Sequence, residues 1–324
     1  MNNDLRYFRD PEFGNKLEKK NNYLYNKSGE KYRIVNNIPR FVNRDNYSND
    51  FGKQWNKFPK TQLDSYSGLN ISEKRLENSI NVPLNNLSNK YILEAGSGAG
   101  RFTEILLKHG GIVHSFDYSN AVEANASNNS DYSNLLLSQA DIRKIPYQKN
   151  FYDYVICLGV IQHTPNPNES ISSLWQMVKP GGRLVFDQYL FSLKTFMPPP
   201  LGQALELYRF FILRLKKENR FDVVKKLVDF WFPVHWRFRN NYLFTRILRR
   251  ISPVIFYYNI LPLKDKKMHY EWSLLDTHDS TTDYYRHSTT IKKIKETLSN
   301  IEAENITLSK NGNGICVSCV KPTN

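Results

Sequence analysis

Three alternating glycines follow a short apolar segment in the first third of the chain. Residues 91–95 read Tyr-Ile-Leu-Glu-Ala, and Gly96, Gly98 and Gly100 come next. Because glycine has no Cβ, such a turn lets the backbone approach a ligand closely. A helical pattern begins directly after the turn, and its first N–H groups face the same place. The stretch therefore predicts a small-molecule site at a strand-to-helix turn.

Two further carboxylates follow the next two predicted strands. Asp117 ends the second strand, twenty-three residues after Glu94, and Asp141 follows the third. An acidic residue at the end of the second strand can accept hydrogen bonds from both hydroxyls of a ribose. A dinucleotide fingerprint starting at Gly96 would need a third glycine at position 101. Arg101 stands there, and its bulk opposes the close helix–strand packing of that fingerprint.

The spacing E-x-G-x-G-x-G, with the two aspartates in order behind it, resembles the class I S-adenosylmethionine-dependent methyltransferases of the type 11 kind. The resemblance covers residues 91–189 and is closest to the group of ubiquinone and menaquinone pathway C-methyltransferases and many small-molecule O-methyltransferases. It implies S-adenosylmethionine as the cofactor. It also implies that Glu94 attracts the cofactor's ammonium, and that Asp141 and the Ile142 N–H bind its adenine.

The residues expected to bind the cofactor come from the ends of four strands and from the segment before the first one. They are Glu94, Ala95, Gly96, Ser97, Gly98, Gly100, Asp117, Tyr118, Asp141, Ile142, Leu158, Gly159, His163, Gln54 and Trp55. No metal site is expected.

The acceptor side is less defined by the sequence. His163 follows the fourth strand, where many relatives of the resembled family carry a histidine, and it could remove the proton of an acceptor hydroxyl. The alternative is that His163 only shapes the cofactor pocket. Asp187 and Tyr189 at the end of the fifth strand, and His278 within the cluster 276–279, are further candidate catalytic residues.

Strand and helix patterns alternate from 91 to 189. This alternation predicts an α/β fold with a Rossmann-like, seven-stranded, mostly parallel sheet and helices on both faces, in which ligands bind beyond the carboxyl ends of the strands. A helical insert precedes a terminal β-hairpin that closes at Asn-Gly-Asn-Gly. The expected division is an N-terminal arm at 1–50, a helical lid at 51–90, a cofactor-binding core at 91–189, the insert at 190–288 and a terminal helix and hairpin at 289–324.

The two segments before the core have separate interpretations. Residues 31–42 read as two short extended pieces around Asn36-Asn37 and resemble the end of a zinc-ribbon module. Because the first cysteine is Cys157, the arm is predicted to be a metal-free remnant. Residues 51–90 either cover one edge of the sheet or form a lid in which Gln54, Trp55 or Gln62 touches the cofactor.

The insert carries most of the positive charge. Residues 204–269 hold fifteen Lys or Arg against five Asp or Glu, and fourteen aromatic residues. Basic helices with aromatic residues favour peripheral contact with an anionic membrane. The alternative is a helical cap with solvated charges.

The full-length pattern also resembles a bacterial subgroup often linked to surface polysaccharide loci, which implies a glycan acceptor, including a lipid-linked one.

The length, net charge and cysteine count of the chain limit the classes of function that it can have. The chain has 324 residues, a net charge of +14 and three cysteines, too few for a disulfide framework. No secretory signal or membrane-spanning segment is apparent, so we expect a cytoplasmic protein, peripheral at the inner face of the membrane.

The leading hypothesis is methyl transfer to a small-molecule or glycan acceptor, at oxygen. The alternatives are an RNA methyltransferase, although no RNA-binding module is visible, and a silent cofactor-binding scaffold. The sequence does not indicate an oligomeric state.

Overall fold

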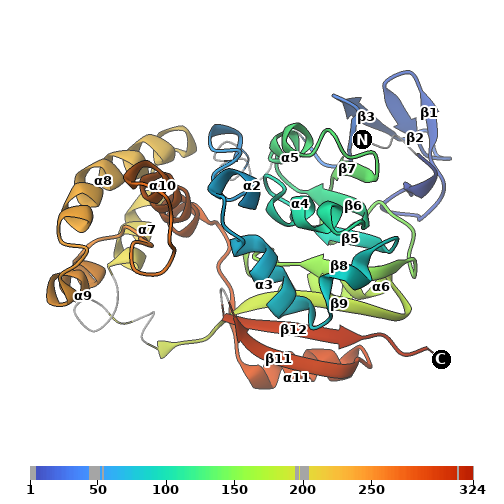
Figure 1. The fold of residues 1–324 in the computed structure, drawn as a ribbon. Coiled ribbons are helices and arrows are strands. Elements are labelled where there is room, and N and C mark those ends of the chain that lie inside the picture. Colours follow the sequence, from blue (N-terminus) through green and yellow to red (C-terminus); the bar gives the residue numbers. More distant parts are fainter. Residues whose placement is uncertain are drawn as a thin grey trace.

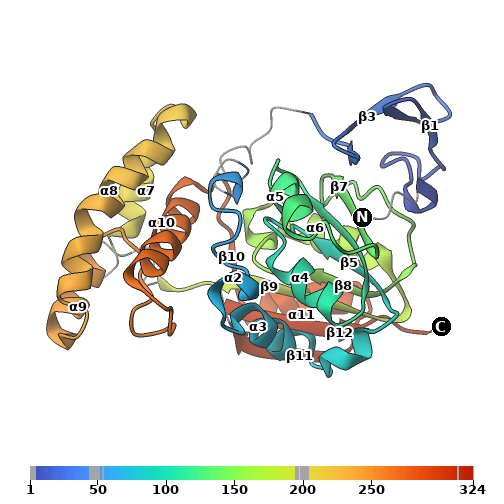
Figure 2. The same ribbon diagram turned by 45° about the horizontal axis from the view of Figure 1, so that its top comes forward.

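A single sheet runs through the molecule, with helices on both of its faces and a helical lobe beside it (Figures 1 and 2). The computed structural model describes residues 5–43, 52, 55–193, 197, 204–311 and 314–323. Within this part of the chain the core strands, in spatial order, are β7 (Leu135–Gln139), β6 (Ile112–Asp117), β5 (Tyr91–Ala95), β8 (Tyr152–Cys157), β9 (Val178–Leu190), β12 (Gly314–Val320) and β11 (Glu304–Asn311).

These strands form the predicted Rossmann-like sheet. Neighbours from β7 to β9 are parallel, whereas β12 is antiparallel to both β9 and β11. The antiparallel pair of β11 and β12 confirms the terminal hairpin, and Asn311 pairs with Gly314 across its turn. Gly312 and Asn313 lie outside the described residues.

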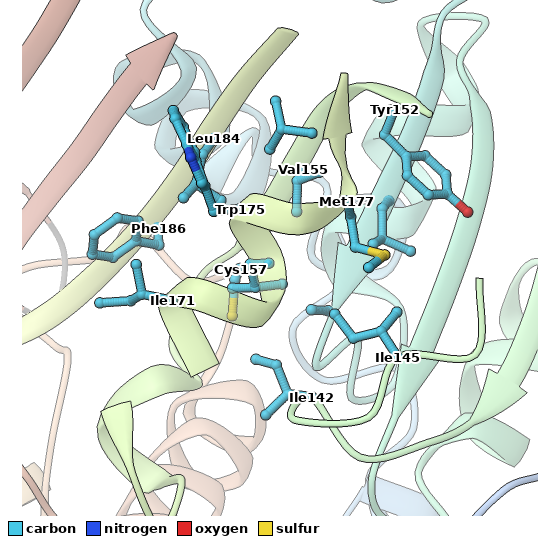
Figure 3. Packing of buried hydrophobic residues seen from close by; sticks show 14 of the residues in the cluster. Ile142, Ile145, Tyr152, Val155, Cys157, Ile171, Trp175, Met177, Leu184 and Phe186 are labelled. Atoms are coloured by element: carbon cyan, nitrogen blue, oxygen red, sulfur yellow. The ribbon is translucent and has the colours of Figure 1, made fainter. Parts of the chain in front are cut away.

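Side chains alternate between two buried layers, as strands covered on both faces require. Ile92 packs with residues of α3 (Ile71–Ile80), α4 (Arg101–Lys108) and α5 (Val122–Asn128). The next residue, Leu93, belongs to the opposite layer, beneath α6 (Pro167–Met177) and α11 (Ile291–Asn300). In that layer Cys157 lies among apolar side chains (Figure 3). The core therefore fixes the strand ends that carry the polar residues.

Local capping explains several boundaries. Pro167 begins α6, and the Asn166 side chain accepts a hydrogen bond from Glu169 N. Ser72 has a residue type that suits a helix cap, but it does not cap α3. Asp64 of α2 (Asp64–Ser67) accepts from the N–H groups of Ser72 and Glu73, both at 2.9 Å, and so caps α3 from eight residues upstream.

Residues 179–182 read Lys-Pro-Gly-Gly, which suits a turn, but they do not form a separate element. These residues belong to β9, which absorbs them as an irregularity in its pairing with β8. Gly181 has a φ of +74°, and its N–H donates to Lys321 O at 2.9 Å, while Lys321 N donates to Gly182 O. The strand continues because these backbone groups remain paired.

The N-terminal segment extends the sheet. The elements are η1 (Leu5–Tyr7), β1 (Glu18–Lys20), β2 (Tyr23–Tyr25), β3 (Lys31–Val35) and β4 (Ile38–Arg40). Asn36 and Asn37, with φ of 53° and 62°, form the expected turn between β3 and β4. Beyond this turn, Arg40 pairs with Gln139 of β7 in parallel register, a connection that the sequence did not predict.

The insert forms the helical lobe, as predicted. It contains α7 (Leu205–Ile212), α8 (Lys217–Arg237), α9 (Tyr242–Ile251) and α10 (Lys266–Thr282). The chain leaves the sheet after β9 and returns through β10 (Ser288–Thr289), which pairs in parallel with the end of β9. Phe191 N donates to Thr289 O at 2.8 Å, so the two ends of the insert lie side by side. In the described part of the chain, no helix is both long and apolar enough to cross a bilayer.

Candidate functional site

The glycine turn is closed in by neighbouring side chains. A Cβ on Gly96, where φ is +76°, would lie 2.3 Å from a Val160 methyl group. A Cβ on Gly98 would lie 3.3 Å from the Trp55 indole. Trp55 belongs to the segment before the core, and its ring lies beside the turn at Gly98. Gln54 lies outside the described residues.

Two buried oxygen atoms at this turn have no hydrogen-bond partner in the described structure. Glu94 is 2% exposed, and its Oε2 accepts from Thr103 at 2.5 Å and Ser115 at 2.9 Å, but its Oε1 has none. Ser97 Oγ is also unpaired. Burial raises the pKa of Glu94 to about 7. Buried polar atoms are normally paired, so these two fit a ligand with donors, such as the ammonium of the methionine part of S-adenosylmethionine.

Asp117 joins the end of β6 to the glycine turn. Its Oδ2 accepts from Gly98 N at 2.9 Å, and its Oδ1 accepts from the Ser119 N–H and hydroxyl. Burial raises the pKa of Asp117. The next residue, Tyr118, accepts from the Gln139 amide through its carbonyl. The carboxylate thus lies beside the turn, where a ribose hydroxyl would reach it.

Asp141 lies at the end of β7, as expected, but it is paired with another side chain. Arg143 Nη2 and Nε donate to it at 2.7 and 3.1 Å, and Arg143 N donates at 2.9 Å. Ile142 is 6% exposed and lies in the core layer of Figure 3. If Asp141 accepts a hydrogen bond from an adenine amino group, its carboxylate must bind that group and Arg143 at the same time. The role of Asp141 stays a prediction.

A side chain of β9, Asp187, holds the turn at the end of β8 in place. Gly159, with φ of +80°, follows Leu158 and donates from its N–H to Asp187 Oδ1 at 2.6 Å. Arg75 of α3 donates to Asp187 Oδ2 at 2.7 Å. Asp187 is 2% exposed, so both of its oxygen atoms are used inside the protein. This geometry favours positioning of the Gly159 turn over proton removal as the role of Asp187.

His163 ends η3 (Ile161–His163), directly after this turn. Its Nδ1 lies 3.4 Å from Asp283 Oδ2 and 3.2 Å from Tyr285 O, and its Nε2 lies 3.5 Å from the Tyr189 hydroxyl. Burial lowers the pKa of His163, but the carboxylates of Asp283 and Asp279 outweigh it, so the pKa is raised. Burial, with Asp279 close by, raises the pKa of Tyr189, so its hydroxyl stays protonated. His163 and Tyr189, two of the candidate catalytic residues, therefore lie side by side.

The acidic cluster on α10 divides into two faces. Asp276 contacts Gln62 of the lid, and Asp279 lies near His163; burial raises the pKa of Asp279 to about 7 even though the nearby His163 lowers it. His278 is 2% exposed, and its ring centroid lies 5.4 Å from that of Phe221 on α8. Burial lowers the pKa of His278 to about 4. This placement inside the lobe argues against the predicted catalytic role of His278.

A chain of hydrogen bonds connects the lid, the helix after the glycine turn and the insert. Gln62 Oε1 accepts from Arg101 Nη1 at 2.6 Å, and Gln62 Nε2 donates to Asp276 Oδ1 at 3.0 Å. Tyr257 donates its hydroxyl to the other oxygen of Asp276. The amide of Gln62 is used in this bridge. Its position supports closure of the lid.

The sequence missed Asp283, the carboxylate closest to His163. Asp283 is fully buried, and its Oδ1 accepts from Arg209 Nε at 2.7 Å. Asp283 lies 120 residues after His163 and just beyond the cluster that was singled out, so no local spacing connects the two. The only available signal was the helical period, which places Asp276, Asp279 and Asp283 on one face.

Comparison with known proteins assigns the core to a class. Residues 93–186 match the family model described as "Methyltransferase domain", which is under a third of the chain. Residues 93–186 are thus a methyltransferase domain, and its cofactor is S-adenosylmethionine.

Two curated relatives match about the same part of the chain. A ubiquinone biosynthesis O-methyltransferase of Coxiella burnetii is 29% identical over 118 residues, covering 36% of this chain and 50% of the relative. The Pseudomonas fluorescens protein of the same name is 30% identical over 123 residues, covering 36% and 52%. The chain therefore spans about half the length of the curated relatives it matches.

Among solved structures, a putative S-adenosylmethionine-dependent methyltransferase of Methanococcus maripaludis is 14% identical, with a TM-score of 0.46. The match covers 87% of this chain and 97% of that one. A likeness of this degree carries no argument about function.

Proposed function

We propose that this protein transfers a methyl group from S-adenosylmethionine to a hydroxyl oxygen of a small-molecule or glycan acceptor. The observation that carries the proposal is the approach of His163 to Asp283 beside the end of β8, on the same edge of the sheet as Glu94 and Asp117. The methyltransferase domain supplies the cofactor class, and the histidine–carboxylate pair supplies a base for the acceptor.

The chain's own residues would perform three tasks. Nδ1 of His163 donates to Tyr285 O at 3.2 Å and faces Asp283 Oδ2 at 3.4 Å, which leaves Nε2 to take the proton of the acceptor hydroxyl. Tyr189 lies beside Nε2 and would orient that hydroxyl. The lid would exclude water through Trp55 and the Gln62 bridge. When bound, S-adenosylmethionine supplies an electrophilic methyl group, and alignment with the acceptor oxygen contributes much of the acceleration.

The acceptor class is part of the proposal. A deprotonated Asp279 would repel a carboxylate or phosphate group on the acceptor, whereas the hydroxyls of a sugar can donate to it. This favours a polyol acceptor. A lipid-linked sugar presented at the inner face of a bacterial membrane, from a polysaccharide pathway, is consistent with the basic insert.

Two measurements test the proposal. Calorimetry with S-adenosylhomocysteine should give binding that Asp117→Ala weakens and that Asp153→Ala, at the opposite end of the sheet, leaves unchanged. Labelled-methyl transfer into fractionated extract should place the label in a glycan or small-molecule fraction and should depend on His163. Label in RNA, with tight salt-dependent RNA binding, would favour the alternative that the net charge of +14 suggests. Cofactor binding without any transfer would leave the scaffold alternative.

A further inference from the structure

Helix α9 presents apolar side chains that nothing in the described structure covers. Leu243, Ile247 and Ile251 are 69%, 55% and 46% exposed, and their spacing of four residues places them on one face. Thr245 and Leu248 are buried and attach the helix to the lobe. The helix lies at the outer end of the lobe, away from the sheet (Figures 1 and 2).

The charge around this stripe has one sign. Arg246, Arg249 and Arg250 lie on the same helix. Between Asp229 and Asp265 the chain contains no Asp or Glu and has six Lys or Arg. Some of these side chains lie on aromatic rings, such as Arg249, whose guanidinium is 5.2 Å from the centroid of Phe256. The apolar stripe of α9 is therefore bordered by arginines, and the surrounding segment contains no acidic residue. These features complement a surface that carries negative charge on its outside and is apolar beneath.

We propose that α9 docks on an anionic phospholipid bilayer, with Leu243, Ile247 and Ile251 inserted and its arginines at the headgroups. Amphipathic basic helices of this kind lie in the plane of the interface. Tyr242, which is 75% exposed at the start of the helix, suits the same boundary. This proposal goes beyond the methyl transfer proposed above and does not depend on it.

The size of the stripe favours a bilayer over a protein partner. A helix of ten residues is only about 15 Å long. A stable protein interface buries roughly 800 Å² on each partner, which is more than three aliphatic side chains on one helix present. A bilayer sets no such minimum, because the lipids adapt to the inserted side chains.

Sedimentation with vesicles tests the proposal. The full chain should sediment with vesicles of phosphatidylglycerol and phosphatidylcholine, and much less with pure phosphatidylcholine. High salt should weaken the binding, because it screens the arginines. The triple variant Leu243→Ser, Ile247→Ser and Ile251→Ser should bind at least about tenfold more weakly. A matched control, Ile291→Ser with Ile306→Ser, removes two residues that are each 42% exposed on the core and should bind like the wild type.

A fluorescent probe locates the contact independently. The three native cysteines are at most 2% exposed, so Ile247→Cys can be labelled selectively. Its environment-sensitive dye should shift to the blue with anionic vesicles, and a dye at Ile306→Cys should not. Circular dichroism and S-adenosylhomocysteine binding report whether each variant remains folded. The proposal is overturned if the wild type does not bind anionic vesicles, or if the triple variant binds them as tightly as the wild type does. It is also overturned if α9 instead mediates concentration-dependent self-association without lipid.

Discussion

Asp283 Oδ2 lies 3.4 Å from Nδ1 of His163, although the two residues are joined only through the whole helical insert. Arg209 of α7 holds the other oxygen of Asp283 at 2.7 Å. The insert therefore places a buried carboxylate beside His163 at the edge of the sheet. This relationship makes the chemistry of His163 dependent on how the lobe is attached.

Asp283→Asn should lower the pKa of His163. The carboxylate of Asp283 raises that pKa, and the amide removes its charge while it keeps its shape. Titration of the His163 resonance by NMR, assigned with His163→Gln, measures the shift. The acidic limb of the rate profile should move to lower pH, and turnover should fall by about tenfold to a hundredfold, because a misoriented base loses part of its effect. Asp229→Asn, which changes an exposed carboxylate on α8, is the control. An unchanged His163 titration would contradict the assignment of Asp283 as its positioning residue.

Glu94 should make cofactor binding depend on pH. Because burial raises the pKa of Glu94 to about 7, much of it is protonated near neutrality. A cofactor ammonium favours the carboxylate, so binding should release a proton and the affinity for S-adenosylhomocysteine should rise with pH through neutrality. Calorimetry in buffers of different ionisation enthalpy counts the released proton. Glu94→Gln should weaken binding and remove the proton release, and exposed Glu77→Gln should do neither. Equal proton release from the Glu94→Gln variant would assign it to another group.

Gln62→Leu should loosen the lid. The change leaves the partly buried Arg101 and Asp276 without their shared amide, which costs about 1–3 kcal/mol in comparable cases. We expect a lower melting temperature and faster tryptic cleavage after Lys57 and Lys60. Gln148→Leu, at an exposed partner of Arg9, controls for loss of a surface glutamine. If cleavage is unchanged, the bridge does not hold the lid closed.

His235 should make the protein less stable in acid. Burial lowers its pKa to about 4, with Arg249 adding to the effect, whereas an unfolded histidine titrates near 6.5. The unfolded chain therefore binds the proton first as the pH falls, so stability present above about pH 6.5 is lost towards pH 4. At about pH 5 the loss is about 2 kcal/mol. Urea unfolding at about pH 7 and about pH 5 should show this loss in the wild type and much less in His235→Gln. An equal loss in both proteins would assign it to other groups.

Much of the core was predictable because its signals are local. The alternation of strands and helices predicted the parallel sheet, and Glu94, Asp117 and Asp141 lie at the strand ends where the sequence expects them. The contacts that the sequence did not reveal join distant segments. Arg40 pairs with Gln139 across almost a hundred residues, and Asp283 reaches His163 through the folded lobe. The cap of α3 is a further example, since Asp64 reaches that helix by a bend in the chain.

The adjacent ends of the insert have an evolutionary consequence. Phe191 and Thr289 are hydrogen-bonded neighbours, so nearly a hundred residues between them could be exchanged for another segment without a change in the path of the sheet. A replacement would need a carboxylate in the place of Asp283 beside the same histidine, and another in the place of Asp276 to keep the bridge through Gln62. Under the proposed function, exchange of this lobe would alter acceptor preference and leave the glycine turn and the strand ends in place.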